Sequence, residues 1–256
     1  MNNIFNLTRF CRLFVKHTVE HYKSYLMSLA VLIGVMILGG SFLVYMIEAP
    51  IDRGFQTAIF SMILFLAGTI FTSTVFAGYG DKKKAISLLT LPASHFEKYL
   101  VAWLYSFLIF SIVYSVCFYL VVLLAINVKH FPGHPSEIIN ILRWPVCGMF
   151  VLYAFLHSVA FLGAIFFEKL HFIKTAFLFF ISLMLLIIAN KILLGTLIGE
   201  KMDTPVPFGY VRLRLNGQAA EIGLTSFQDN WLILIISVLA LIFWVAAYYR
   251  LKEKQV

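Results

Sequence analysis

Residues 100–126 have the sequence LVAWLYSFLIFSIVYSVCFYLVVLLAI, which contains no Asp, Glu, Lys, Arg or His. At a rise of about 1.5 Å per residue, a helix of this length is long enough to cross the roughly 30 Å of hydrocarbon in a bilayer. A helix in water needs one strongly polar face, which this segment lacks. We therefore predict a membrane-spanning helix here.

The rest of the chain shows the same character. Of the 256 residues, 61% are apolar and 12% are charged, against roughly a quarter charged in soluble domains. Apolar stretches long enough to cross a bilayer cover 26–47, 57–77, 100–126, 144–167, 175–197 and 231–249. The sequence predicts an all-α polytopic membrane protein with six transmembrane helices, forming one membrane domain over 1–256.

The distribution of Lys and Arg predicts the orientation. With the N-terminus in the cytoplasm, thirteen of the twenty Lys and Arg residues fall on the inner side and seven on the outer side. Cytoplasmic loops carry the excess of positive charge. We therefore expect both termini in the cytoplasm. The charged residues between 9 and 23 are incompatible with a cleavable signal peptide, so we expect the first span to direct insertion.

Residues 1–25 combine apolar side chains near helical spacing with the basic residues Arg9, Arg12 and Lys16 on another face. This pattern is typical of an amphipathic helix in the cytoplasmic interface, with its basic side chains toward lipid phosphates. A plain polar extension of the first span is the alternative.

Two connections have a pattern of their own. Residues 78–98, GYGDKKKAISLLTLPASHFEK, predict a short structured cytoplasmic element, in which Pro92 opens the next helix and Ser94 and Glu97 occupy its first turn. Residues 199–230 form the long outer loop, and alternation around Asn216-Gly217 predicts a small extracytoplasmic β-hairpin within 210–224.

Few polar residues fall inside the spans. His157 lies near the middle of the fourth span. It is either a neutral imidazole bonded to a neighbouring helix, which we favour, or a proton-relay or ligand-binding group. Thr69, Thr72 and Ser73 share one face of the second span, where packing against another helix is favoured over substrate contact.

Small residues recur in the first span as well. Gly34, Gly39 and Gly40 lie within residues 26–47. Glycine lets helices approach closely in a membrane. The first span is therefore expected to pack closely against a neighbour.

The motifs of enzymes are missing from the sequence. It has no GxxxxGK[ST] phosphate loop, no HExxH and no GxSxG. Cys11, Cys117 and Cys147 have no metal-ligand spacing, and we expect His17 and His21, four residues apart, to lie on a solvated face of the cytoplasmic helix rather than to bind zinc. We expect no enzyme activity, disulfide, metal or cofactor on this chain. The net charge of +8 is not gathered into a nucleic-acid-binding tract.

The order of these elements resembles the type-2 permease family of ATP-binding-cassette (ABC) transporters. The local similarity is strongest at residues 81–98, where charged residues precede an aliphatic run and a Leu-Pro-x-Ser sequence, and the closing residues 249–254 resemble the tails of such permeases from Bacteroidetes-type bacteria. The resemblance implies a bacterial inner-membrane exporter subunit. It would pair with a second copy or a paralogue and with a separate ATPase subunit that holds ATP and Mg²⁺.

In that family the segment after the second span docks on the ATPase as a coupling helix. The resemblance assigns this role here to Lys82, Lys83, Lys84, Leu88, Leu89, Leu91, Pro92, Ser94, Glu97 and Lys98. An aliphatic patch ringed by charge suits a protein groove. Two other functions stay open: a secondary transporter, which would normally show inverted repeats and acidic coupling residues, and a non-transporting membrane scaffold.

Overall fold

The computed structural model describes residues 5–46, 52–80, 92–128, 138–198, 211–215, 218–222 and 226–253. Six helical segments within these ranges are long and apolar enough to cross a membrane. This confirms the prediction of a polytopic α-helical membrane protein. The helices are α1 (Leu7–Met46), α2 (Arg53–Gly80), α4 (His95–Trp103), the π-helix η1 (Leu104–Ile109), α5 (Phe110–Val128), α6 (Val146–Phe166), α7 (His171–Ile198) and α8 (Ser226–Glu253).

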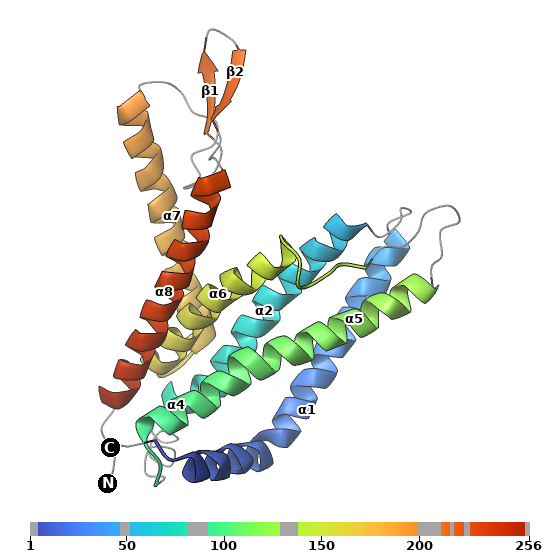
Figure 1. The fold of residues 1–256 in the computed structure, drawn as a ribbon, viewed down its shortest axis with the longest axis vertical. Coiled ribbons are helices and arrows are strands. Elements are labelled where there is room, and N and C mark those ends of the chain that lie inside the picture. Colours follow the sequence, from blue (N-terminus) through green and yellow to red (C-terminus); the bar gives the residue numbers. More distant parts are fainter. Residues whose placement is uncertain are drawn as a thin grey trace.

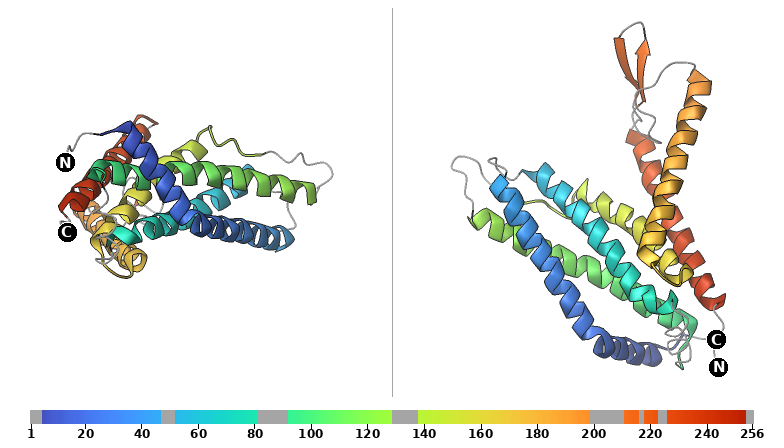
Figure 2. Two further views of the ribbon diagram at one scale, coloured as in Figure 1. Left: turned by 90° about the horizontal axis from the view of Figure 1, so that it is seen from below. Right: turned by 180° about the vertical axis from the view of Figure 1, so that it is seen from behind.

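Helix α6 lies at the centre of the fold. It packs against α2, α7 and α8, while α1 lies along α4 and α5. The pair α7 and α8 leans away from α1, α2 and α5, so the molecule has the outline of a V (Figures 1 and 2). The start of α1, the start of α4 and the end of α8 lie together at one end of the molecule.

The N-terminal segment and the first span form one helix. We expected an interfacial helix within 1–25 followed by a separate span, but α1 runs without a break from Leu7 to Met46. Its first part, the darkest blue in Figure 1, turns away from the rest. The hydroxyl of Thr18 donates to the carbonyl oxygen of Phe14 at 2.8 Å, a bond of the kind that bends helices.

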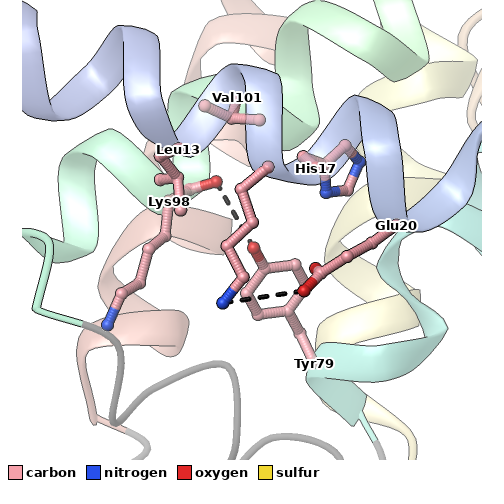
Figure 3. A pocket seen from close by; sticks show the side chains of 7 residues that line it. Leu13, His17, Glu20, Tyr79, Lys98 and Val101 are labelled. Atoms are coloured by element: carbon pink, nitrogen blue, oxygen red, sulfur yellow. Dashed lines mark hydrogen bonds and ion pairs between the residues drawn. The ribbon is translucent and has the colours of Figure 1, made fainter.

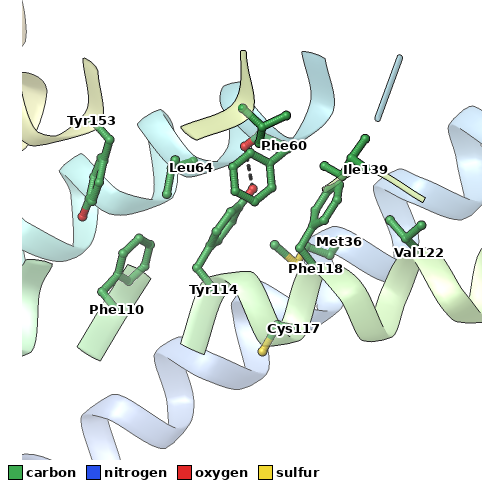
Figure 4. Close-up of a cluster of buried hydrophobic side chains, with 11 residues drawn as sticks. Met36, Phe60, Leu64, Phe110, Tyr114, Cys117, Phe118, Val122, Ile139 and Tyr153 are labelled. Carbon is green, nitrogen blue, oxygen red and sulfur yellow. Dashed lines mark hydrogen bonds between the residues drawn. The ribbon is translucent and has the colours of Figure 1, made fainter. Parts of the chain in front are cut away.

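Buried apolar side chains form two clusters. The first joins α1, α2, α5 and α6, and the hydroxyl of Tyr114 there donates to the carbonyl oxygen of Phe60 at 2.6 Å (Figure 4). The second, around Phe76, Tyr99 and Phe161, joins the ends of α2 and α6 to α4 and α8. The long third span, which consists of α4, η1 and α5, contributes to both clusters. Its α5 part belongs to the first cluster and its α4 part to the second.

Glycines permit the closest helix contacts around α6. A Cβ atom added at Gly68 would lie 2.3 Å from the ring of Tyr153, and one at Gly163 would lie 1.9 Å from Oγ1 of Thr175. The prediction of close packing at the glycines of the first span holds for one of the three within this chain. A Cβ at Gly40 would contact Val121 of α5 at 3.9 Å, whereas among the described residues nothing lies within 4 Å of a Cβ at Gly34 or Gly39.

Two short strands lie between α7 and α8. Strand β1 (Val211–Leu215) pairs antiparallel with β2 (Gln218–Ile222), with Leu215 opposite Gln218. The predicted turn, Asn216-Gly217, and most of the connection from α7 lie outside the described residues. The complete hairpin and its extracytoplasmic position therefore stay predictions.

The contact between α6 and α7 predicts a sensitive position. Gly163→Ala places a methyl group against the branched side chain of Thr175, whose hydroxyl is held by the carbonyl oxygen of His171 at 2.7 Å. We expect a loss of about 1–3 kcal/mol from overpacking, measured as a lower midpoint of thermal unfolding in detergent.

The matched control is Gly34→Ala, since no described atom lies within 4 Å of the added carbon. It should be neutral or stabilising, because alanine is the better helix former by roughly 1 kcal/mol. Equal effects of the two substitutions would contradict the close contact at Gly163.

Candidate functional site

Helix α4 begins with a capping box. The backbone N–H of Glu97 donates to the hydroxyl oxygen of Ser94 at 3.2 Å, and the backbone N–H of Ser94 donates to Oε2 of Glu97 at 2.9 Å. The two residues satisfy donors that a helix start leaves open. This confirms the prediction that Ser94 and Glu97 occupy the first turn of the third span.

Glu97 also holds the start of α1. Its Oε1 accepts from the backbone N–H of Asn6 at 2.8 Å and from Nη2 of Arg9 at 2.9 Å, and its Oε2 accepts from Nε of Arg9 at 3.1 Å. The carboxylate is 0% exposed, whereas the Arg9 side chain is 32% exposed. We call Asn6, Arg9, Ser94 and Glu97 the Glu97 clamp. A bidentate arginine fixes both distance and orientation, so the clamp holds α1 and α4 in one geometry.

The clamp changes the interpretation of the basic residues on α1. Arg9 was expected to point toward lipid phosphates, but it turns inward because a buried carboxylate needs a partner. Arg12 and Lys16 are exposed, and Nζ of Lys16 lies 3.6 Å from a carboxylate oxygen of Glu20.

The assigned coupling residues divide into three groups. Glu97 and Lys98 are buried, 0% and 3% exposed, so they do not belong to an exposed docking surface. Pro92 is exposed and Ser94 is half-buried at the start of α4. The others lie outside the described residues: Lys82, Lys83, Lys84, Leu88, Leu89 and Leu91.

A small cavity lies beside the clamp, between α1, α2 and α4. Figure 3 shows its lining, which includes Lys16, His17, Glu20, Tyr79 and Lys98. Its volume of about 20 Å³ is enough for one water molecule. The hydroxyl of Tyr79 donates to the carbonyl oxygen of Lys98 at 3.4 Å across it. The cavity is too small for an organic substrate.

Aromatic side chains fasten the first part of α1 to the π-helix. The ring of Tyr105 stacks on Phe14 at 4.9 Å and on Tyr25 at 5.3 Å between centroids, and its hydroxyl contacts that of Thr18. The Nε2 atom of His17 lies 2.6 Å from the hydroxyl of Tyr25. The start of α1 and the third span are therefore packed together over several turns.

A polar layer lies deeper in the molecule, around His157. Its Nε2 lies 2.8 Å from Oγ of Ser106 in η1, and its Nδ1 accepts from the indole N–H of Trp244 in α8 at 3.0 Å. The hydroxyl of Tyr153 donates to the carbonyl oxygen of Ser106 at 3.1 Å. His157 is 0% exposed. We call Ser106, Tyr153, His157 and Trp244 the His157 layer.

The contacts of the layer define the tautomer of His157, and this tautomer differs from that of a hydrolase general base. An indole nitrogen can only donate, so Nδ1 of His157 carries no proton. In the neutral ring the proton is then on Nε2, which donates to Ser106. A general base must instead accept from the nucleophile at this atom. The contacts agree with the favoured interpretation of His157 as a neutral, helix-linking imidazole.

The hydroxyls of Thr69 and Thr72 in the second span donate to carbonyl oxygens of their own helix. Thr72 donates to the carbonyl oxygen of Gly68 at 2.7 Å, and Thr69 donates to that of Phe65 at 2.7 Å. Thr72 and Ser73 are buried, and Ser73 has no hydrogen-bond partner for its hydroxyl among the described residues. This face lies where α2 packs on α6, which agrees with the packing interpretation.

Sequence reasoning missed Ser106 and Trp244. Ser106 gives no signal, because isolated serines are common in spans. Trp244 does give one: it lies well inside the predicted span 231–249 rather than at its end. Away from the interface an indole N–H needs a partner within the protein.

The clamp makes Arg9 more important for stability than its neighbour Arg12. Arg9→Leu leaves the buried Glu97 carboxylate without its cation, and we expect a loss on the order of 3 kcal/mol. Thermal unfolding in detergent, followed by tryptophan fluorescence, measures the change. The control is Arg12→Leu, at an exposed position, which should change stability by less than about 0.5 kcal/mol. Similar losses for both variants would contradict the clamp.

Removing the partner of His157 predicts a second loss. Ser106→Ala leaves the Nε2–H of His157 without its acceptor, at an expected cost of about 1 kcal/mol. Ser115→Ala is the control, because Ser115 donates only to the carbonyl oxygen of Ser111 on its own helix, at 2.7 Å. Denaturant unfolding in detergent compares the two. A loss at Ser115 as large as that at Ser106 would contradict the assigned bond.

Comparisons with known proteins add no family to these observations. No protein-family model matches the chain, and neither curated proteins nor solved structures yield a match. The described residues therefore show a helical protein with six helices suited to crossing a membrane, a clamp at one end and a polar layer within.

Proposed function

We propose that this chain is the membrane-spanning permease subunit of an ABC exporter, driven by a separate ATPase subunit. The resemblance of the element order and of residues 81–98 to type-2 permeases motivates the proposal. Six helices suited to crossing a membrane are consistent with it. ATP and Mg²⁺ would be bound by the partner.

The Glu97 clamp is the observation that favours this function most. It lies at the first turn of α4, six residues after Leu91. Leu91 is the last residue of the proposed docking segment, which we define as residues 81–91. Through Arg9 the clamp connects the first turn of α4 to α1 as well. A force applied to residues 81–91 by a moving ATPase would therefore reach α1 and α4 together. A connection without such a clamp would transmit less of the force, because its backbone is free to rearrange.

The proposed mechanism needs no chemistry on this chain. Closure of two ATPase subunits on ATP would draw the docking segments of two permeases together. Each docking segment would tilt its clamped pair, α1 and α4, and open a path between the permeases to the outer side. The second permease would be another copy or a paralogue. The membrane would be the bacterial cytoplasmic membrane, with the N- and C-termini in the cytoplasm.

The rival functions have less support. A secondary transporter needs ionisable coupling groups that substrate and ions can reach, whereas His157 is fully buried and bonded on both nitrogens. A scaffold would not need a clamp that joins the starts of two spans. It stays the alternative if no ATPase binds.

The test is co-purification in mild detergent with an ABC ATPase encoded beside this chain. The variant carries Lys82→Ser, Lys83→Ser, Lys84→Ser and Leu91→Asp. We expect a stoichiometric complex with the native chain and roughly tenfold less recovered ATPase with the variant, the effect of about 1.4 kcal/mol of lost binding.

The control carries Lys191→Ser, a lysine in α7 near the end remote from the docking segment. It should bind the ATPase as the native chain does. A native chain that purifies alone would overturn the permease proposal in favour of a scaffold. A complex unaffected by the four substitutions would overturn the assignment of the docking segment.

A further inference from the structure

The third span is interrupted by a π-helix. Helix α4 ends at Trp103, η1 covers Leu104–Ile109, and α5 begins at Phe110. At the end of η1 the backbone N–H of Phe110 is shared between the carbonyl oxygens of Tyr105 and Phe107. A π-turn is wider and more weakly bonded than an α-turn, and such turns recur at kinks and functional sites. Residues 104–109 are therefore the weakest part of the span.

The interruption coincides with the boundary between the two apolar clusters. Tyr99 and Ala102 of α4 belong to the cluster around Phe161, whereas Phe110 and Tyr114 of α5 belong to the cluster around Phe60. The buried residues of η1, Tyr105 and Ser106, belong to neither. The span thus changes packing partners at the place where its backbone is weakest.

The part before the interruption is bound to α1 and α8. The Glu97 clamp and the stacking of Tyr105 on Phe14 join it to α1. The hydroxyl of Tyr99 donates to the carbonyl oxygen of Trp244 at 3.0 Å, which joins it to α8. The first part of α1, α4 and the end of α8 therefore pack together at this end of the molecule.

At the level of η1 the third span meets its neighbours through rings and polar groups. The ring of Phe107 lies 5.3 Å from that of Trp103 and 5.4 Å from that of Trp244 between centroids. The hydroxyl of Tyr153 donates to the carbonyl oxygen of Ser106 at 3.1 Å. The side chain of Ser106 bonds His157, which in turn bonds Trp244. Hydrogen bonds are directional, so they hold one bend and are lost at another.

We propose that residues 104–109 form a hinge and that the His157 layer is the latch that holds it in the present geometry. When the bonds of His157 to Ser106 and Trp244 break, α4 swings together with the first part of α1 relative to α5. The inference does not depend on the identity of any partner.

The hinge is tested by spin-label distances in the full chain in nanodiscs. The exposed native Cys11 carries one label, and Val128→Cys at the end of α5 carries the other, in a chain with Cys117→Ala and Cys147→Ser. The reference pair is Ile112→Cys with Val128→Cys in a chain that also has Cys11→Ser. Its two sites lie within α5, 16 residues or about 24 Å apart.

Two conservative substitutions open the latch. Trp244→Phe keeps a ring but removes the N–H that bonds Nδ1 of His157, and Ser106→Ala removes the partner of Nε2. We expect each to add a second distance population between residues 11 and 128 that the native chain lacks, while the reference distance stays single. Ser115→Ala, within α5 and outside the layer, should leave both distances as in the native chain.

Two results would overturn the proposal. One is a distance between residues 11 and 128 that stays the same in both latch variants. The other is a reference distance that spreads as much as the test distance, because α5 itself would then be deforming. Since no ATPase is present, neither result depends on the proposed transport function.

Discussion

The structure depends on one constraint: a polar group inside hydrocarbon must find its partner within the protein. Thr72 and Ser115 meet it by donating to carbonyl oxygens of their own helices, whereas the buried hydroxyl of Ser73 has no partner among the described residues. Buried Gln56 meets it by accepting from the backbone N–H of Ile139, between α5 and α6. Polar residues that cannot bond locally gather at the few places where helices must be joined in one geometry.

The same constraint explains what could be predicted from the sequence. The six spans follow from uninterrupted apolar runs, and the capping box follows from Ser94 and Glu97 three residues apart, since both signals are local. The pairing of Arg9 with Glu97 and of Trp244 with His157 spans 88 and 87 residues. No local pattern specifies such partners. The sequence does not show which glycines lie at close helix contacts, for the same reason. Only the fold distinguishes Gly163, which is crowded, from Gly34, which has space around it.

The two polar sites have different roles in the fold. The Glu97 clamp lies at the end where α1 and α4 begin, and its carboxylate is fixed by donors from two chain segments. The His157 layer lies where the backbone of the third span is irregular, and its bonds join α6 to η1 and to α8. A charged and bidentate contact suits a permanent joint, whereas single neutral hydrogen bonds exchange at lower cost.

The distance along the chain between Arg9 and Glu97 has a consequence for biosynthesis. Ribosomes add roughly 5–20 residues per second, so the 88 residues that separate the pair take on the order of ten seconds to make. During that interval the first two spans are made. Glu97, the partner of Arg9, has not yet been synthesised. The start of α1 can therefore reach its contact with Glu97 only after the first two spans have been made.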